Sequence, residues 1–195
     1  MNRRKFIKHS ALKVLGLGGT FCLSGLFSAS FVEASIHSKT IPGFTELQKD
    51  QPYLNPPRLI KNPAATRRHS PETRKFTGIP STAISHNGRI WAIWYAGPTP
   101  GEDKNNYVVI ATSGDEGKTW KELLAIDPDG EGPVRGYDPQ VWIDPDGRLW
   151  IFWSQTIGSF GSVAGVWTMT ISNSDSEDPV WSETRRLTDG VMMCK

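Results

Sequence analysis

The chain has 195 residues, a net charge of +2 at pH 7, four histidines and two cysteines. Two cysteines are too few for a disulfide framework, and the histidines and cysteines follow no zinc-binding spacing. The two Asp-Pro-Asp-Gly segments lack the spacing of an EF-hand and are explained as Asp-Gly turns. We therefore expect neither a metal nor another cofactor.

Residues 1–34 have the features of an export signal. Residues 3–8 read Arg-Arg-Lys-Phe-Ile-Lys, which fits the twin-arginine pattern, and glycines interrupt the apolar stretch that follows. That stretch is too weakly apolar for a transmembrane helix, which needs about 20 strongly apolar residues. We expect the twin-arginine export machinery as a partner, cleavage near Ala34 and a periplasmic or extracellular location. An ordinary secretory signal would predict the same location.

Removal of residues 1–34 changes the charge of the chain. The segment holds five basic residues and one acidic residue, so the net charge falls from +2 to −2. The basicity belongs to the targeting segment, and no nucleic-acid partner is predicted. Only Cys194 would remain, so no intramolecular disulfide can form. Residues 35–73 are rich in proline and show little periodicity, which predicts an irregular arm that packs along the first blade or remains partly disordered.

The most informative segment is 113–120, Ser-Gly-Asp-Glu-Gly-Lys-Thr-Trp. It predicts a tight β-hairpin in which Asp115 accepts backbone N–H bonds and Gly117 adopts a positive φ. Ser113, Asp115, Gly117, Thr119 and Trp120 match the pattern Ser/Thr-x-Asp-x-Gly-x-Thr-Trp, which resembles the Asp box of the sialidase family. In that family the hairpin lies at the rim of a propeller blade, so the resemblance implies a structural role for these residues.

This hairpin belongs to a repeat. A shift of 59 residues places 80–94 on 139–153, and each copy reads as strand, Asn-Gly or Asp-Gly turn, strand. Residues 107–112 then correspond to 166–171 as a third strand, and 175–181 form a looser second Asp box. Four strands per repeat describe a propeller blade. All eight tryptophans lie between residues 91 and 181, and their regular recurrence favours packing between blades over a sugar-stacking platform.

The predicted fold is an all-β, sialidase-like β-propeller of four-stranded antiparallel blades. Blade 1 is expected at 74–133, blade 2 at 134–190 and the start of a third blade at 191–195. Propellers close with roughly 4–8 blades, and the resemblance implies six. We therefore expect an N-terminal fragment of a longer protein, with open blade faces that favour self-association. Three copies closing one ring is the alternative.

The resemblance also implies a sugar site, with one clear departure. Sialidases open their first blade with Phe/Tyr-Arg-Ile-Pro, whose arginine binds the carboxylate of sialic acid. Here residues 76–80 read Phe-Thr-Gly-Ile-Pro, so Gly78 stands in the place of the arginine. Arg74 or Arg68 could replace it, and otherwise Arg74 is a solvated charge before a strand. His69 has no counterpart in the family and is expected on the surface of the arm.

The loop after the second strand carries the family's general acid/base. The segment from Tyr95 to Asp103 keeps the family's spacing, so the resemblance implies that Asp103 is the proton donor. A neighbouring carboxylate such as Glu102 could raise its pKa toward the working pH. The alternative is that this segment is only a polar loop tip.

The second blade carries the other candidate residues. Residues 136–139, Gly-Tyr-Asp-Pro, correspond to a family Ser-Asp-Pro motif, which implies that Asp138 lines the sugar pocket, with Arg135 beside it. A buried structural Arg–Asp bridge is an equal alternative.

Together these features predict an exported glycoside hydrolase of the exo-α-sialidase type, which releases a terminal acidic sugar from its glycan substrate. This chain lacks the family's tyrosine nucleophile and is expected to be inactive alone. The alternatives are a polysaccharide lyase or non-sialic glycosidase on the same propeller, or a non-catalytic carbohydrate-binding propeller.

Overall fold

The computed structural model describes residues 51–158 and 163–191. The expected export signal, the first part of the arm, Cys194 and the last residues of the expected third blade lie outside these ranges. Strands and short 3-10 helices make up the regular structure of the described residues. Among them no helix is long and apolar enough to cross a membrane.

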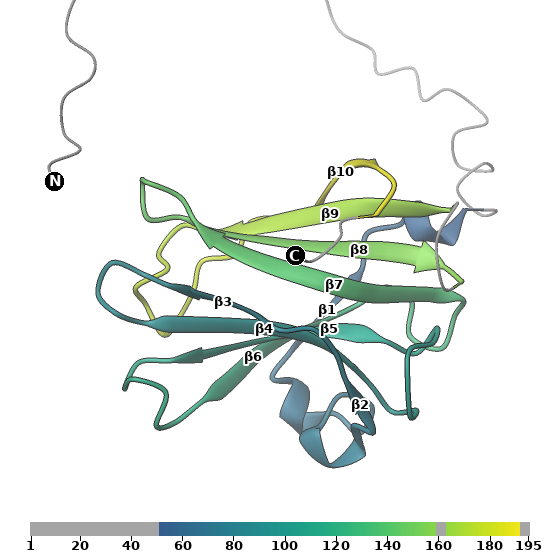
Figure 1. The fold of residues 1–195 in the computed structure, drawn as a ribbon, viewed down its shortest axis with the longest axis horizontal. Helices are drawn as coiled ribbons and strands as arrows, with labels where there is room; N and C mark the ends of the chain where they lie inside the picture. Colours follow the sequence, from purple (N-terminus) through teal and green to yellow (C-terminus); the bar gives the residue numbers. More distant parts are fainter. Residues whose placement is uncertain (1–50, 159–162, 192–195) are drawn as a thin grey trace, which may run out of the picture. The chain divides into compact units, whose positions relative to one another are not determined.

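The first sheet has six antiparallel strands in the order β1-β6-β5-β4-β2, and β3 also pairs with β4 (Figure 1). Its strands are β1 (Arg58–Lys61), β2 (Phe76–Thr77), β3 (Ser81–Ile84), β4 (Ile90–Gly97), β5 (Tyr107–Ser113) and β6 (Lys121–Asp127). Because β2 and β3 pair with opposite ends of β4, they form one interrupted strand along its side.

The second sheet is a four-stranded antiparallel meander in the order β10-β9-β8-β7. Its strands are β7 (Val134–Ile143), β8 (Leu149–Ile157), β9 (Ala164–Ile171) and β10 (Arg185–Asp189). The all-β prediction is confirmed, and the two sheets have the form of propeller blades. We call β2–β6 the first blade and β7–β10 the second blade.

Local sequence explains the hairpins and the two faces of each strand. Gly88 and Gly147, in the predicted Asn-Gly and Asp-Gly turns, have φ values of +91° and +82°. Along β4, Trp91, Ile93 and Tyr95 belong to the core that the two blades share, because alternate side chains of a strand point to opposite faces.

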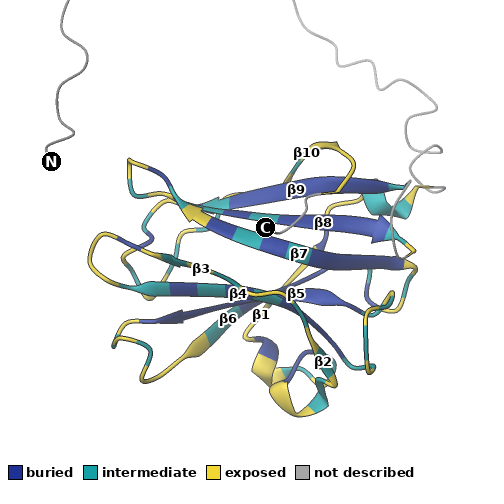
Figure 2. Ribbon diagram, in the orientation of Figure 1, coloured by how far each residue is buried: buried dark blue, intermediate teal, exposed yellow. Residues whose placement is uncertain are grey.

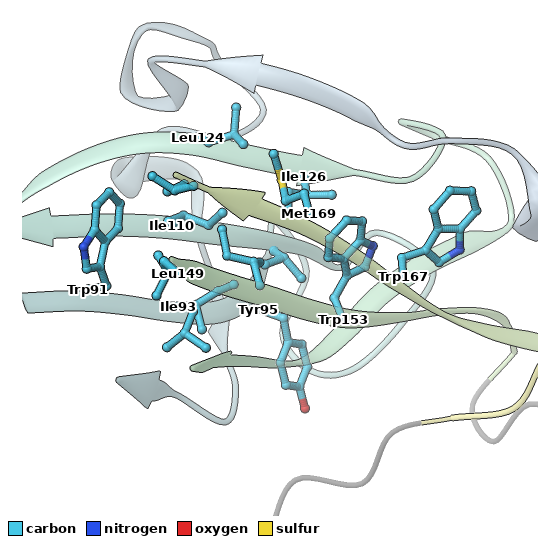
Figure 3. Packing of buried hydrophobic residues seen from close by; sticks show 14 of the residues in the cluster. Trp91, Ile93, Tyr95, Ile110, Leu124, Ile126, Leu149, Trp153, Trp167 and Met169 are labelled. Carbon is cyan, nitrogen blue, oxygen red and sulfur yellow. The ribbon is translucent and has the colours of Figure 1, made fainter. Parts of the chain in front are cut away.

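The two blades pack face to face through this core. Figure 3 shows side chains of both sheets in contact, and Figure 2 shows that burial is concentrated on β5, β8 and β9. Trp91 and Trp153 are completely buried, whereas Trp120 and Trp142 are 48% and 54% exposed. The predicted packing role therefore describes Trp91 and Trp153 but not Trp120 and Trp142 in this chain.

The strand register corrects one detail of the repeat. Ile93 pairs with Ile110, whereas its counterpart Phe152 pairs with Thr168. The third strands therefore correspond with a shift of 58 residues, not the 59 predicted. The difference matters because a slip of one residue moves every side chain to the other face of the sheet.

The arm is more regular than predicted. Residues 58–61 form β1 on the outer edge of β6, and the 3-10 helices are η1 (Pro52–Leu54), η2 (Pro63–Ala65) and η3 (Pro71–Thr73). The buried Gln155 side chain on β8 donates hydrogen bonds to the carbonyls of Tyr53 and Asn55. The arm thus crosses from the second blade to the first. Residues 58–61 pack along the first blade as expected, but they do so as a regular strand because the free edge of β6 provides a pairing partner that local sequence does not show.

Candidate functional site

The Asp-box hairpin joins β5 to β6 and is closed by its own hydrogen bonds. The Asp115 carboxylate accepts the Thr119 backbone N–H at 2.9 Å, the Thr119 hydroxyl at 2.6 Å and the Ser113 hydroxyl at 2.8 Å. These bonds, those from Thr119 first, lower the pKa of Asp115 to about 2. Gly117 has φ +83°, and the Trp120 indole N–H donates to its carbonyl at 3.0 Å. The carboxylate is therefore committed to the turn.

The second Asp box works between the blades. The Asp175 carboxylate accepts the backbone N–H of Asn87 at 3.0 Å, in the turn between β3 and β4. The Asp175 carbonyl accepts bonds from the side chains of Asn87 and Arg89. This looser copy ties the second blade to the first and does not close its own turn in the same way.

A polar cluster forms where the end of β4, the loop that follows it and the start of β7 meet. Glu102 accepts the hydroxyl of Tyr95 at 2.7 Å and Nη2 of Arg135 at 2.6 Å. The Arg135 guanidinium carbon lies 4.5 Å from the ring centroid of Tyr137, and Asp138 follows on β7. Figure 3 shows the Tyr95 hydroxyl pointing out of the apolar core. We call Tyr95, Glu102, Arg135, Tyr137 and Asp138 the Glu102 cluster.

A backbone irregularity positions Asp138 in this cluster. The pairing of β7 with β8 shifts register between Tyr137 and Gln140, and Asp138 has φ +45°. A non-glycine residue in this region stores about 1–3 kcal/mol of strain, which occurs mainly at functional sites. The bulge redirects the side chain of Asp138 relative to a regular strand.

The surroundings of the two carboxyl groups in the cluster shift their pKa values in opposite directions. Burial and the nearby Glu102 raise the pKa of Asp138 against the opposing effect of Arg135. The hydrogen bond from Arg135 lowers the pKa of Glu102 and outweighs its partial burial. Burial and Glu102 also raise the pKa of the Tyr95 hydroxyl, and burial raises that of Tyr137 to about 12. Both phenols are therefore protonated at neutral pH, and that of Tyr95 donates its hydrogen bond to Glu102.

Asp103 lies in the same loop but bonds to the loop itself. Its carboxylate accepts the backbone N–H of Asn105 at 2.8 Å, and its own N–H donates to the Asn106 side chain at 2.8 Å. Burial would raise the pKa of Asp103, but hydrogen bonds within the loop and the charge of Arg135 outweigh it and lower the pKa. The carboxylate that binds Arg135 is therefore that of Glu102. The catalytic role of Asp103 stays a prediction.

Arg74 lies on the other side of the first blade. Its guanidinium binds both carboxylate oxygens of Glu122, at 2.5 and 2.6 Å, and also donates to the Tyr107 hydroxyl and the His69 carbonyl. Its guanidinium carbon lies 6.0 Å from the ring centroid of Trp94, whose side chain points away from the face that holds Tyr95. The structure does not bring Arg74 to the Glu102 cluster, and Arg74 is not the solvated charge of the alternative interpretation.

The place of the family's arginine is filled by an aromatic ring. A Cβ atom on Gly78 would lie 2.3 Å from the Tyr95 ring. An arginine at position 78 therefore needs Tyr95 to move, so the departure from the family pattern involves both residues.

His69 is buried and does not lie on the surface as expected. Its Nε2 lies 2.8 Å from the Asp127 carboxylate, which also accepts Arg68 Nε at 3.1 Å and the Gly130 N–H at 2.9 Å. These contacts lower the pKa of Asp127 although its burial would raise it. Arg68 is thus committed to anchoring the arm, and it is not beside the Glu102 cluster. The sequence missed this because the arm carries no motif for packing against β6.

Sequence reasoning also missed the roles of Glu102, Tyr95 and Tyr137 in the cluster. All three lie next to the quoted motifs, but their contact depends on the packing of β4 against β7, which no local pattern specifies. Within residues 51–158 and 163–191, no group of three or more His, Cys, Asp or Glu side chains is placed to hold a metal ion.

Comparison with known proteins identifies a structure with a similar fold. No family model matches the chain, and no curated protein matches it. Among solved structures the chain is similar to the Hadza microbial sialidase Hz136, with 20% sequence identity and a TM-score of 0.50. The match covers 61% of this chain and 27% of that sialidase. At this identity the similarity shows a sialidase-like fold.

Proposed function

We propose that this chain is part of an exported glycoside hydrolase with a sialidase-like fold, and that the Glu102 cluster forms part of its sugar site. The observation that carries the proposal is the contact across the blades, in which Glu102 of the β4–β5 loop binds Arg135 of β7 at 2.6 Å. The carboxyl groups of Glu102, whose side chain is half exposed, and of the partly buried Asp138 thus belong to one polar cluster beside an apolar core.

The acid–base properties of this cluster support hydrolysis. Most glycosidases use one carboxyl group that is protonated and one that is ionised, and sialidases replace the ionised carboxylate nucleophile with a tyrosine. A raised pKa at Asp138 and a lowered pKa at Glu102 separate the two groups in the required sense. Asp103 remains the proton donor that the resemblance implies, and Asp138 is the second candidate for that role.

The test is hydrolysis by the protein purified from its host at its native length, on a panel of fluorogenic glycosides that includes a sialoside. We expect turnover of at least one glycoside and a fall in kcat of about 10²- to 10⁴-fold on Asp103→Asn or Asp138→Asn, whichever is the donor. The matched control is Asp146→Asn, because Asp146 is an exposed residue of the β7–β8 turn. If no glycoside is cleaved, the proposal fails.

Carbohydrate binding without turnover is the second candidate function. The observation that favours it is that Arg135 holds Glu102 ionised and that hydrogen bonds within the loop also lower the pKa of Asp103. Two ionised carboxylates accept hydrogen bonds from hydroxyl groups well but donate protons poorly at neutral pH. Saccharide binding by a native-length protein that cleaves no glycoside would select this function.

Export through the twin-arginine machinery is a separate proposal that rests on residues 3–8. Replacing Arg3 and Arg4 with lysine should hold the protein in the cytoplasm of its host, as measured by cell fractionation. Undiminished export of that variant would indicate an ordinary secretory signal.

A further inference from the structure

We propose that the Glu102 cluster binds a neutral sugar through the hydroxyl groups of that sugar, and that it is not a carboxylate site for an acidic sugar. This inference rests on the proposed function and names its substrate class. It departs from the acidic sugar that the sequence resemblance implies.

The first step is the supply of positive charge. Recognition of a carboxylate by arginine uses two parallel N–H donors of a free guanidinium. Position 78 holds glycine with the Tyr95 ring against it, and Arg74 is bound on both sides of its guanidinium fork to Glu122. Neither position can offer a free guanidinium to the cluster.

The second step is the net charge around Arg135. Its guanidinium is already paired with Glu102, while Asp138 and Asp103 are close enough to feel its charge. A second anion would meet these carboxyl groups with the positive charge already neutralised. A neutral ligand avoids this repulsion.

The third step is the hydrogen-bonding capacity that remains. The Glu102 side chain is 51% exposed, and each of its oxygens accepts one bond from the protein. A carboxylate has about four acceptor sites, so Glu102 retains capacity for hydroxyl donors. The Arg135 side chain is only 2% exposed, yet its Nε is buried without a partner among the described residues. An unsatisfied buried donor calls for an acceptor from a ligand or from water.

Sugar hydroxyls match this combination because each donates one bond and accepts others. Adjacent hydroxyls can donate to the two oxygens of Glu102, whose side chain is 51% exposed. The cluster therefore fits adjacent hydroxyl groups of a neutral pyranose or furanose.

The test measures binding by saturation-transfer NMR, which requires no turnover. The probes are the methyl glycosides of glucose, galactose, mannose, xylose, arabinose and fucose, together with the methyl glycosides of sialic acid and glucuronic acid. We expect at least one neutral glycoside to bind at least tenfold more tightly than either acidic one. Equal or tighter binding of an acidic glycoside would overturn the inference, and so would the binding of none of the probes.

Variants locate the binding. Glu102→Gln should weaken the neutral glycoside at least tenfold and should not weaken the acidic ones, because it removes a negative charge and frees Arg135. Asp138→Asn is the second variant, and Asp146→Asn is the control that should bind as the wild type does. Unchanged neutral binding in both Glu102→Gln and Asp138→Asn would place the site elsewhere and reject the inference.

The two proposals fail in different ways. Binding of a neutral glycoside without hydrolysis by the native-length protein rejects the hydrolase and leaves the inference standing. Cleavage of a sialoside supports the hydrolase and rejects the inference.

Discussion

The Arg74–Glu122 and Arg135–Glu102 pairs both join an arginine to a glutamate, but they differ in exposure and in hydrogen bonding. We call the first the closed pair and the second the open pair. Arg74 binds both oxygens of Glu122, and the side chains of Arg74 and Glu122 are 7% and 17% exposed. Arg135 makes one bond to Glu102, its Nε has no partner among the described residues, and the Glu102 side chain is 51% exposed.

The difference supports the proposal that the Arg135–Glu102 pair belongs to the sugar site and that the Arg74–Glu122 pair is structural. The closed pair holds the arm against the first blade, because Arg74 also donates to the His69 carbonyl within the arm and to Tyr107 on β5. The open pair leaves an acceptor exposed and a donor unsatisfied, which suits it to a ligand.

Breaking the closed pair should have the largest effect. Arg74→Ala leaves Glu122 mostly buried without its partner, which should lower the free energy of unfolding by about 3–5 kcal/mol. Urea denaturation measures the change. Lys118→Ala, which breaks an exposed pair with Glu116, is the control and should change stability by less than about 1 kcal/mol. A loss below about 1 kcal/mol for Arg74→Ala would remove the distinction between the two pairs.

Filling the space beside the open pair should have an intermediate effect. In Gly78→Ala the new Cβ meets the Tyr95 ring, and such overpacking typically costs about 1–3 kcal/mol. In a Tyr95→Leu background the same substitution should cost clearly less, and a double-mutant cycle measures the coupling. Gly114→Ala meets only the end of the Arg89 side chain and is the control. Additive effects of the two substitutions would show that Tyr95 does not occupy this space.

Removing the open pair should change stability little. Glu102→Gln leaves the buried Arg135 without its charged partner but keeps the shape of the side chain and an amide oxygen that can accept from Arg135, so we expect a loss of less than about 2 kcal/mol in urea denaturation. A loss above about 2 kcal/mol would mean that this pair is structural, like Arg74–Glu122.

The stabilisation that the Asp box gives should be present at neutral pH and lost in acid. The folded state holds the pKa of Asp115 at about 2, below the ordinary value of 3.8. A lowered pKa stabilises the fold above the ordinary value, and this stabilisation is lost as the pH falls toward the folded value. The melting temperature of the wild type should therefore lie above that of Asp115→Asn at neutral pH, and it should fall more steeply than that of the variant between pH 4 and pH 2. Parallel curves for the two proteins would contradict the assignment.

Local patterns predicted much of each blade. The positions of Ser113, Asp115 and Thr119 specify the hydrogen bonds of the hairpin, because all the partners lie within four residues. The glycines of the two short turns and the alternation along β4 likewise depend on residues that are close in the chain.

The patterns failed where the partners are distant. Packing of the arm along the first blade was expected, but the arm gave no signal that residues 58–61 form a strand with β6 or that His69 is buried against Asp127, which is 58 residues away. The resemblance pointed to the loop that contains Glu102, yet only the structure shows that Glu102 contacts Arg135 while the side chain of Asp103 turns back on the loop.

The sequence by itself determined the blades. Their hairpins and alternating faces follow from residues that are close in the chain, and their repetition follows from the similarity of two segments. The tertiary structure decided the Glu102 cluster, because its residues meet only when β4 of one blade packs against β7 of the next and a bulge redirects Asp138. Contacts of this kind depend on side-chain volume, burial and charge across the interface, and these quantities exist only once the two blades have packed.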